Sequence, residues 1–275
     1  MLGKGRALLL VHGTLSRAHT AFGGLSPATV AELCRRYGDR VFAFDHYTMS
    51  EDPIQNVRWL VEQIPDGSQL DFDILCHSRG GLVSRVLAER QSEFSLGSRH
   101  IAVNRIVFVA TPNSGTILTD SQYMGDLLDT YTNLLNFFPT TGVTEVLEGV
   151  VTVAKMLAVG AVGGLPGLQS MLPGGSFLHG FDTAPKGGST YHALTSDYEP
   201  TAPGLKDWAV NRLTDKIFQK AANDLVVPTL GVYEANGSSC FPIPNPHVFP
   251  PERGISHSGY FADPEAQELI LGWLS

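Results

Sequence analysis

The chain has 275 residues, 43% of them hydrophobic, and a formal net charge of −8. This length supplies enough apolar side chains for one large core, and an α/β chain of this size can form a single domain. We therefore expect one domain over residues 1–275. The net negative charge argues against nucleic-acid binding. Such binding also requires clustered Lys and Arg, and these residues are scattered along the sequence.

Cysteine content and apolar segments indicate the compartment. Cys34, Cys76 and Cys240 are too few for a disulfide framework and favour a reducing environment. The apolar run at 7–11 is too short for a secretory signal, so we expect a cytoplasmic protein. Residues 156–181 carry no charge, but their seven glycines and two prolines argue against a membrane-spanning helix. Because a predicted strand begins almost at once, the chain is either a compact enzyme or a domain of a larger polypeptide.

Strand-like and helix-like segments alternate through the first 110 residues. Continuous apolar runs of this kind are typical of strands buried on both faces, so the pattern predicts an α/β fold with a mostly parallel central sheet flanked by helices. Ligands in such sheets bind beyond the carboxyl ends of the strands, where each run here meets polar residues. The predicted strands are 6–11, 40–44, 72–76 and 101–110, and the predicted helices are 27–37, 53–64 and 80–90.

Beyond residue 111 the pattern changes. Residues 130–181 contain only three charged side chains, and apolar residues recur at helical spacing over 143–157. We expect an apolar cap or lid insertion over approximately 116–180; the alternative is that 146–157 is simply a helix packed on the core. The rest predicts a strand at 190–195, a helix at 205–220, a proline-rich loop at 241–251 and a terminal helix at 264–274.

The segment Cys76-His77-Ser78-Arg79-Gly80 lies between a predicted strand and a predicted helix. A serine in a sharp strand-to-helix turn is the context of a nucleophile elbow, which needs small residues two positions before and after it. Cys76 and Gly80 are small, although the usual motif has glycine where Cys76 stands. The motif predicts Ser78 as a nucleophile; the alternative is an ordinary serine at a helix N-terminus.

The first predicted strand ends in His12-Gly13-Thr14. A small turn at this place brings a backbone N–H beside the nucleophile, so we expect an oxyanion hole formed by the N–H groups of Thr14 and Arg79. We expect His12 to fix the loop by hydrogen bonds rather than to transfer protons.

An activated serine also requires a base held by an acid. Asp224 lies in a turn before an apolar run and is the predicted acid; Asp197, directly after the strand at 190–195, is its rival. Either could instead be a turn aspartate bonded to its own backbone. His257, in a loop just before the terminal helix, is the predicted base, with a surface histidine as the alternative. The chain order is then Ser, Asp, His.

Taken together, these motifs resemble those of the α/β-hydrolase superfamily, and within it bacterial triacylglycerol lipases with their esterase and acyltransferase relatives. The resemblance covers nearly the whole chain and implies that Ser78, Asp224 and His257 form a catalytic triad under a cap. The chain lacks the first two strands of the full superfamily sheet and the paired carboxylates of some lipase calcium sites. The matching segments are 12–13, 76–80, 110–116, 171–178, 223–224 and 257–260.

The resemblance implies hydrolysis of a carboxylic ester, such as a lipid, through an acyl-serine intermediate, with no metal or organic cofactor. The expected partner is an ester or lipid substrate, and the apolar cap would make any contact with a lipid surface. Three alternatives stay open: acyl transfer to another alcohol, cleavage of an amide or thioester, and a non-catalytic module that binds a lipid or a protein.

Overall fold

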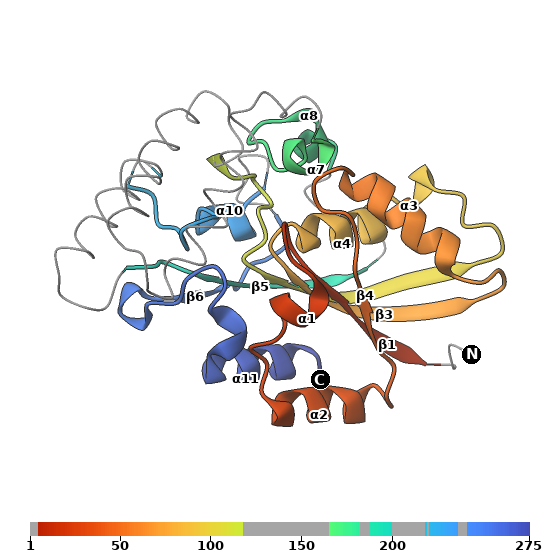
Figure 1. The fold of residues 1–275 in the computed structure, drawn as a ribbon, viewed down its shortest axis with the longest axis horizontal. Coiled ribbons are helices and arrows are strands. Elements are labelled where there is room, and N and C mark those ends of the chain that lie inside the picture. The colour runs from red at the N-terminus through yellow and green to blue at the C-terminus, as the bar shows by residue number, and fades with distance from the viewer. Residues whose placement is uncertain (1–4, 118–164, 182–187, 200–217, 219, 236–240) are drawn as a thin grey trace.

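The computed structural model describes residues 5–117, 165–181, 188–199, 218, 220–235 and 241–275. These residues form a six-stranded sheet in the order β2-β1-β3-β4-β5-β6, in which every neighbouring pair is parallel (Figure 1). The strands are β1 (Arg6–Val11), β2 (Val41–Phe44), β3 (Gln69–His77), β4 (His100–Val109), β5 (Thr190–Ser196) and β6 (His247–Phe249).

Helices cover both faces of this sheet. Helices α3 (Pro53–Gln63) and α4 (Gly80–Glu89) pack on one face, and α2 (Pro27–Arg36) and α11 (Pro264–Trp273) pack on the other (Figure 1). Successive side chains of a strand point to opposite faces, so Ile74 joins the core under α3 and α4 whereas Leu75 joins the other core. Four short α-helices are also described: α1 (Ala18–Ala21), α7 (Pro166–Gln169), α8 (Ser176–His179) and α10 (Leu230–Tyr233). Three 3-10 helices complete the described set: η1 (Gln91–Glu93), η4 (Pro251–Arg253) and η5 (Tyr260–Ala262).

Three of the long helices begin with the same local signal. Ser26, Asp52 and Asp263 each accept a hydrogen bond from a backbone N–H in the first turn, and each is followed by proline. Proline is suited to the first helical position because its missing N–H would have no partner there. These caps fix where the helices start and therefore where the loops at the carboxyl ends of the strands finish.

The parallel sheet and its flanking helices confirm the predicted fold class, and element bounds agree with the predictions to within a few residues. One prediction is wrong: the loop expected at 241–251 contains β6, whose three residues pair in parallel with β5. The predicted helices at 143–157 and 205–220 lie outside the described residues, apart from 218 and 220. So does most of the predicted cap at 116–180, of which 116–117 and 165–180 are described.

Within the described ranges, no helix combines the length and apolar character needed to cross a bilayer. Cys34 and Cys76 carry free thiols, and Cys240 lies outside the described residues.

Candidate active site

Ser78 occupies the turn between β3 and α4. Its backbone has a φ of +54°, a left-handed conformation that is strained for a residue with a Cβ. The Ser78 N–H donates to the carbonyl of Val109 at 2.9 Å, which fixes the turn to the neighbouring strand β4. The structure therefore places Ser78 in the strand, sharp turn and helix arrangement of a nucleophile elbow.

Small residues allow the elbow to pack closely on the end of β1. A Cβ added to Gly80 would lie 2.2 Å from the carbonyl oxygen of Val11, and one added to Gly13 would lie 2.6 Å from Ser78 Cβ. Both distances are shorter than any allowed contact, so glycine is required at both positions. The loop after β1 thus lies directly against Ser78.

His257 and Asp224 form a hydrogen-bonded pair. His257 Nδ1 lies 2.8 Å from Asp224 Oδ2, and the His257 N–H donates to the Asp224 carbonyl at 2.9 Å. Asp224 is fully buried, and its Oδ1 accepts from the N–H groups of Val226 and Val227. Burial opposes ionisation of this carboxyl, but His257 and the hydrogen bonds outweigh it and hold the pKa of Asp224 below its ordinary value. The carboxylate is therefore ionised and orients the imidazole.

Asp197, the rival acid, has a different environment. Its N–H donates to the carbonyl of Phe249, and burial raises the pKa of its carboxyl. Among the described residues it has no ion pair or hydrogen bond with His257. Of the two aspartates, the structure brings only Asp224 to the histidine.

His257 also lies close to the elbow. The rings of His257 and His77, the residue before Ser78, have centroids 4.8 Å apart. Within the described chain, the Ser78 hydroxyl and the His257 ring form no direct hydrogen bond. Such contacts are often long in the absence of substrate and tighten when it binds.

Two further residues of this site are not predicted by any sequence motif. His77 Nε2 donates to the His257 carbonyl at 2.8 Å, and burial lowers the pKa of His77 to about 3, so this ring is neutral. The Tyr260 hydroxyl donates to Asp224 Oδ2 at 3.0 Å and lies 2.8 Å from Ser196 Oγ. Tyr260 lies three residues after His257 in the chain, so the sequence places it near the predicted base. Nothing in the sequence indicates that His77 contacts the His257 segment.

The expected oxyanion donors are available. Among the described residues, neither the Thr14 N–H nor the Arg79 N–H has a hydrogen-bond acceptor in the protein. The loop that carries Thr14 is fixed by the His12 ring, whose Nδ1 donates to the Gly13 carbonyl at 2.9 Å while Nε2 accepts from the His46 N–H at 3.3 Å. Burial lowers the pKa of His12, in agreement with a neutral ring that fixes the loop.

The Arg79 side chain joins three segments around the elbow. It is fully buried, and burial lowers its pKa to about 9. Its guanidinium donates to the carbonyls of Gly167 and Glu51 at 3.1 and 2.5 Å, and to Asn56 Oδ1 at 3.0 Å. These contacts hold the described end of the predicted cap and the loop after β2 against the elbow.

An apolar cluster lies beside the loop after β1, which carries Thr14. Leu82 of α4 packs with residues from the described end of the predicted cap, and the Thr14 hydroxyl lies 3.8 Å from Met171 Sδ. The buried members of the cluster are Leu82, Leu168, Met171 and Leu178.

A family model described as "Domain of unknown function (DUF7379)" matches residues 1–275. The chain belongs to the DUF7379 family. The comparison with curated proteins returns no match.

Solved structures show which fold this DUF7379 chain has. Lipase 1 from Pelosinus fermentans is 13% identical, with a TM-score of 0.58 over 97% of each chain. The mature lipase BlEst2 from Bacillus licheniformis is 12% identical, with a TM-score of 0.51 over 98% of this chain and 91% of that one. The DUF7379 chain thus has an α/β-hydrolase fold similar to that of these two bacterial lipases.

Proposed function

We propose that this DUF7379 protein hydrolyses carboxylic esters through an acyl-serine intermediate. The observation that carries the proposal is the buried Asp224 carboxylate bonded to His257, beside Ser78 in a left-handed turn. A buried, ionised acid that orients a histidine next to a strained serine is the arrangement that activates a hydroxyl nucleophile. The α/β-hydrolase fold supports the same reading.

In the proposed reaction, His257 Nε2 takes the proton of Ser78 Oγ while this oxygen attacks the ester carbonyl carbon. Asp224 stabilises the imidazolium, and the Thr14 and Arg79 N–H groups stabilise the oxyanion. The tetrahedral intermediate collapses, its bond to the alcohol oxygen breaks, and His257 gives its proton to the alcohol. A water, deprotonated by His257, then attacks the acyl carbon of the acyl-serine. The bond from this carbon to Ser78 Oγ breaks, Oγ takes the proton back from His257, and the acid is released.

The proposed substrate is an ester with an apolar acyl chain. The cluster around Leu82 and Met171 places buried apolar side chains beside the loop of the proposed oxyanion hole, where the acyl chain of a bound ester would start. We propose that the cap at 116–180 extends this surface within a single domain over residues 1–275. The triad chemistry itself requires no metal or organic cofactor.

The test is hydrolysis of p-nitrophenyl esters of increasing acyl length, below and above micelle formation, by wild type and Ser78→Ala. Loss of the nucleophile should lower kcat by several powers of ten while the fold is retained. Preference for long chains above micelle formation indicates a lipase, and preference for short chains an esterase. Ser78→Ala with full activity would refute the proposal, as would a folded wild type that cleaves none of the esters.

A further inference from the structure

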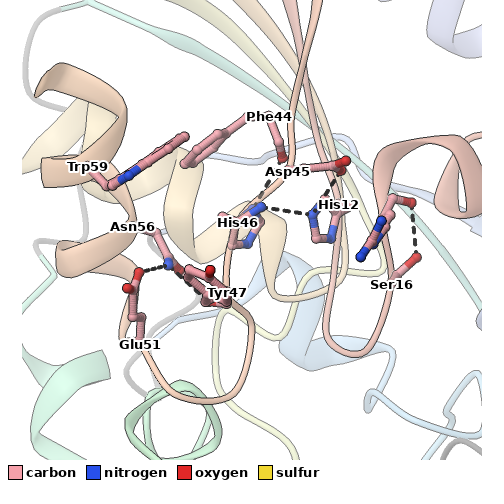
Figure 2. A pocket seen from close by; sticks show the side chains of 10 residues that line it. His12, Ser16, Phe44, Asp45, His46, Tyr47, Glu51, Asn56 and Trp59 are labelled. Atoms are coloured by element: carbon pink, nitrogen blue, oxygen red, sulfur yellow. Dashed lines mark hydrogen bonds and ion pairs between the residues drawn. The ribbon is translucent and has the colours of Figure 1, made fainter. Parts of the chain in front are cut away.

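A cavity lies beside the loop after β1, at the carboxyl end of β2 (Figure 2). Its volume is about 330 Å³, within the range of small-molecule sites. His12, Phe44 and Trp59 contribute to its wall from three different elements. Strand β1 lies between β2 and β3, so this cavity and the turn of Ser78 are two strand spacings apart, about 10 Å in total. This distance is short enough for the alcohol part of an ester held at Ser78 to span.

Aromatic rings form one side of the cavity. Trp59 and Phe44 stack with ring centroids 5.9 Å apart and planes at 13°, and Phe44 stacks on His46 at 5.0 Å (Figure 2). Trp59 and Tyr47 keep 47% and 71% of their surfaces exposed, although both are large aromatic residues. Flat aromatic surface of this kind suits a ring-shaped ligand with apolar C–H faces.

The charges around the cavity balance. Asp45 and Glu51 contribute two carboxylates to its wall, and Arg17 contributes a guanidinium. The buried guanidinium of Arg79 lies behind this wall and donates to the Glu51 carbonyl. His46, which burial holds neutral, adds no charge. The wall therefore favours neither an organic cation nor a phosphate.

One buried polar atom in this wall and one behind it lack a protein partner within the described part of the chain. His46 Nδ1 donates to the Phe44 carbonyl at 3.3 Å, so its Nε2 is an acceptor, and this Nε2 is unpaired. Arg79 Nη1, on the side chain that contacts Asn56, is an unpaired donor. A hydroxyl group both donates and accepts, whereas an ammonium group only donates and a carboxylate only accepts. Hydroxyl groups are thus the chemistry that this wall complements.

We propose that this cavity binds a neutral polyhydroxylated ring, a sugar, as the alcohol part of the ester. Its C–H face packs on Trp59 and Tyr47, and its hydroxyl groups bond to His46 and to the surrounding carboxylates. As a substrate assignment the inference rests on the proposed function, but sugar binding can be measured without turnover.

Binding is tested by saturation-transfer NMR of the wild-type protein with the methyl glycosides of glucose, galactose and mannose. Cyclohexylmethanol is the ring control without ring hydroxyls, and choline is the cation control. We expect transfer to at least one glycoside and to neither control, lost in Trp59→Ala and retained in Val30→Ala, which alters a residue of α2 with a matching 44% exposure. Absence of transfer to all three glycosides, equal transfer to choline, or a signal unchanged in Trp59→Ala would overturn the sugar site.

Specificity is tested with two esters of one acyl chain, 6-O-octanoylglucose and methyl octanoate. Trp59→Ala should lower the ratio of kcat/KM for the sugar ester to that for the methyl ester about tenfold. Val30→Ala should leave the ratio unchanged, and an unchanged ratio in both variants contradicts the assignment. A wild type that binds a glycoside but cleaves neither ester would refute the proposed function and leave the sugar site standing. A wild type that cleaves methyl octanoate but binds no glycoside would refute the sugar site and leave the proposed function standing.

Discussion

Gly13→Ala perturbs the proposed oxyanion hole with the smallest possible change. The added methyl would lie 2.6 Å from Ser78 Cβ, which is 0.8 Å short of the 3.4 Å at which ordinary contact begins. Neither side can yield freely, because Ser78 is bonded to Val109 and the His12 ring holds the loop. The loop and the elbow must therefore separate by most of that distance.

This separation displaces the Thr14 N–H from the carbonyl oxygen of the substrate. Loss of one oxyanion donor typically costs about 3 kcal/mol in the transition state, so kcat should fall by about two to three powers of ten. Overpacking should also lower the free energy of unfolding, by about 1–3 kcal/mol.

The assay is steady-state hydrolysis of p-nitrophenyl butyrate, with urea denaturation to confirm that the variant is folded. Gly272→Ala is the matched control, because nothing lies within 4 Å of its added Cβ, and it should retain wild-type kcat. A folded Gly13→Ala protein with kcat within threefold of wild type would show that the loop after β1 does not support the reaction.

Three further outcomes follow from the site. Tyr260→Phe removes one hydrogen bond from the buried Asp224 carboxylate and should lower the free energy of unfolding by about 2 kcal/mol. Tyr233→Phe is the control, and equal urea denaturation midpoints for the two variants would contradict this expectation. Arg79→Lys keeps the charge, but an ammonium group cannot make all three contacts of the guanidinium. Urea denaturation should therefore show a free energy of unfolding lower by about 2 kcal/mol or more. An unchanged denaturation midpoint would show that these contacts do not stabilise the fold. The folded chain holds the pKa of His77 at about 3, below the ordinary 6.5, so the unfolded chain binds a proton that the folded chain does not between these values. Stability should therefore fall as the pH drops from 7.5 to 5.5, and this fall should be smaller in His77→Gln; an equal fall in both proteins would refute the assignment.

The sequence predicted most of the fold because its local signals agree with one another. Helices α2, α3 and α11 each begin at a capping residue followed by proline, and the apolar runs of β1, β3 and β4 are buried on both faces. Strand β6 was missed because three residues between prolines carry no periodic pattern. Its strand character comes from pairing with β5.

Contacts between segments that are distant in the chain could not be predicted from the sequence. Ser78 and the Asp224–His257 pair are separate motifs whose order along the chain is informative, but the bond from His77 to the His257 loop spans 180 positions. The distribution of charge in the folded chain could not be predicted from the sequence either. Basic residues scattered along the sequence gather in the fold around one cavity, lined by Arg6, Arg35, Arg36, Arg40 and Arg105.

The most direct test of the account is the reaction of the folded protein with a fluorophosphonate, followed by peptide mass spectrometry. Only an activated serine reacts rapidly with this reagent, so the account predicts one covalent adduct, located on Ser78. The adduct should be absent after unfolding in urea, and it should form much more slowly in His257→Gln. A folded protein that carries no adduct, or one that carries it on a different serine, would contradict the claim that Ser78 is the nucleophile.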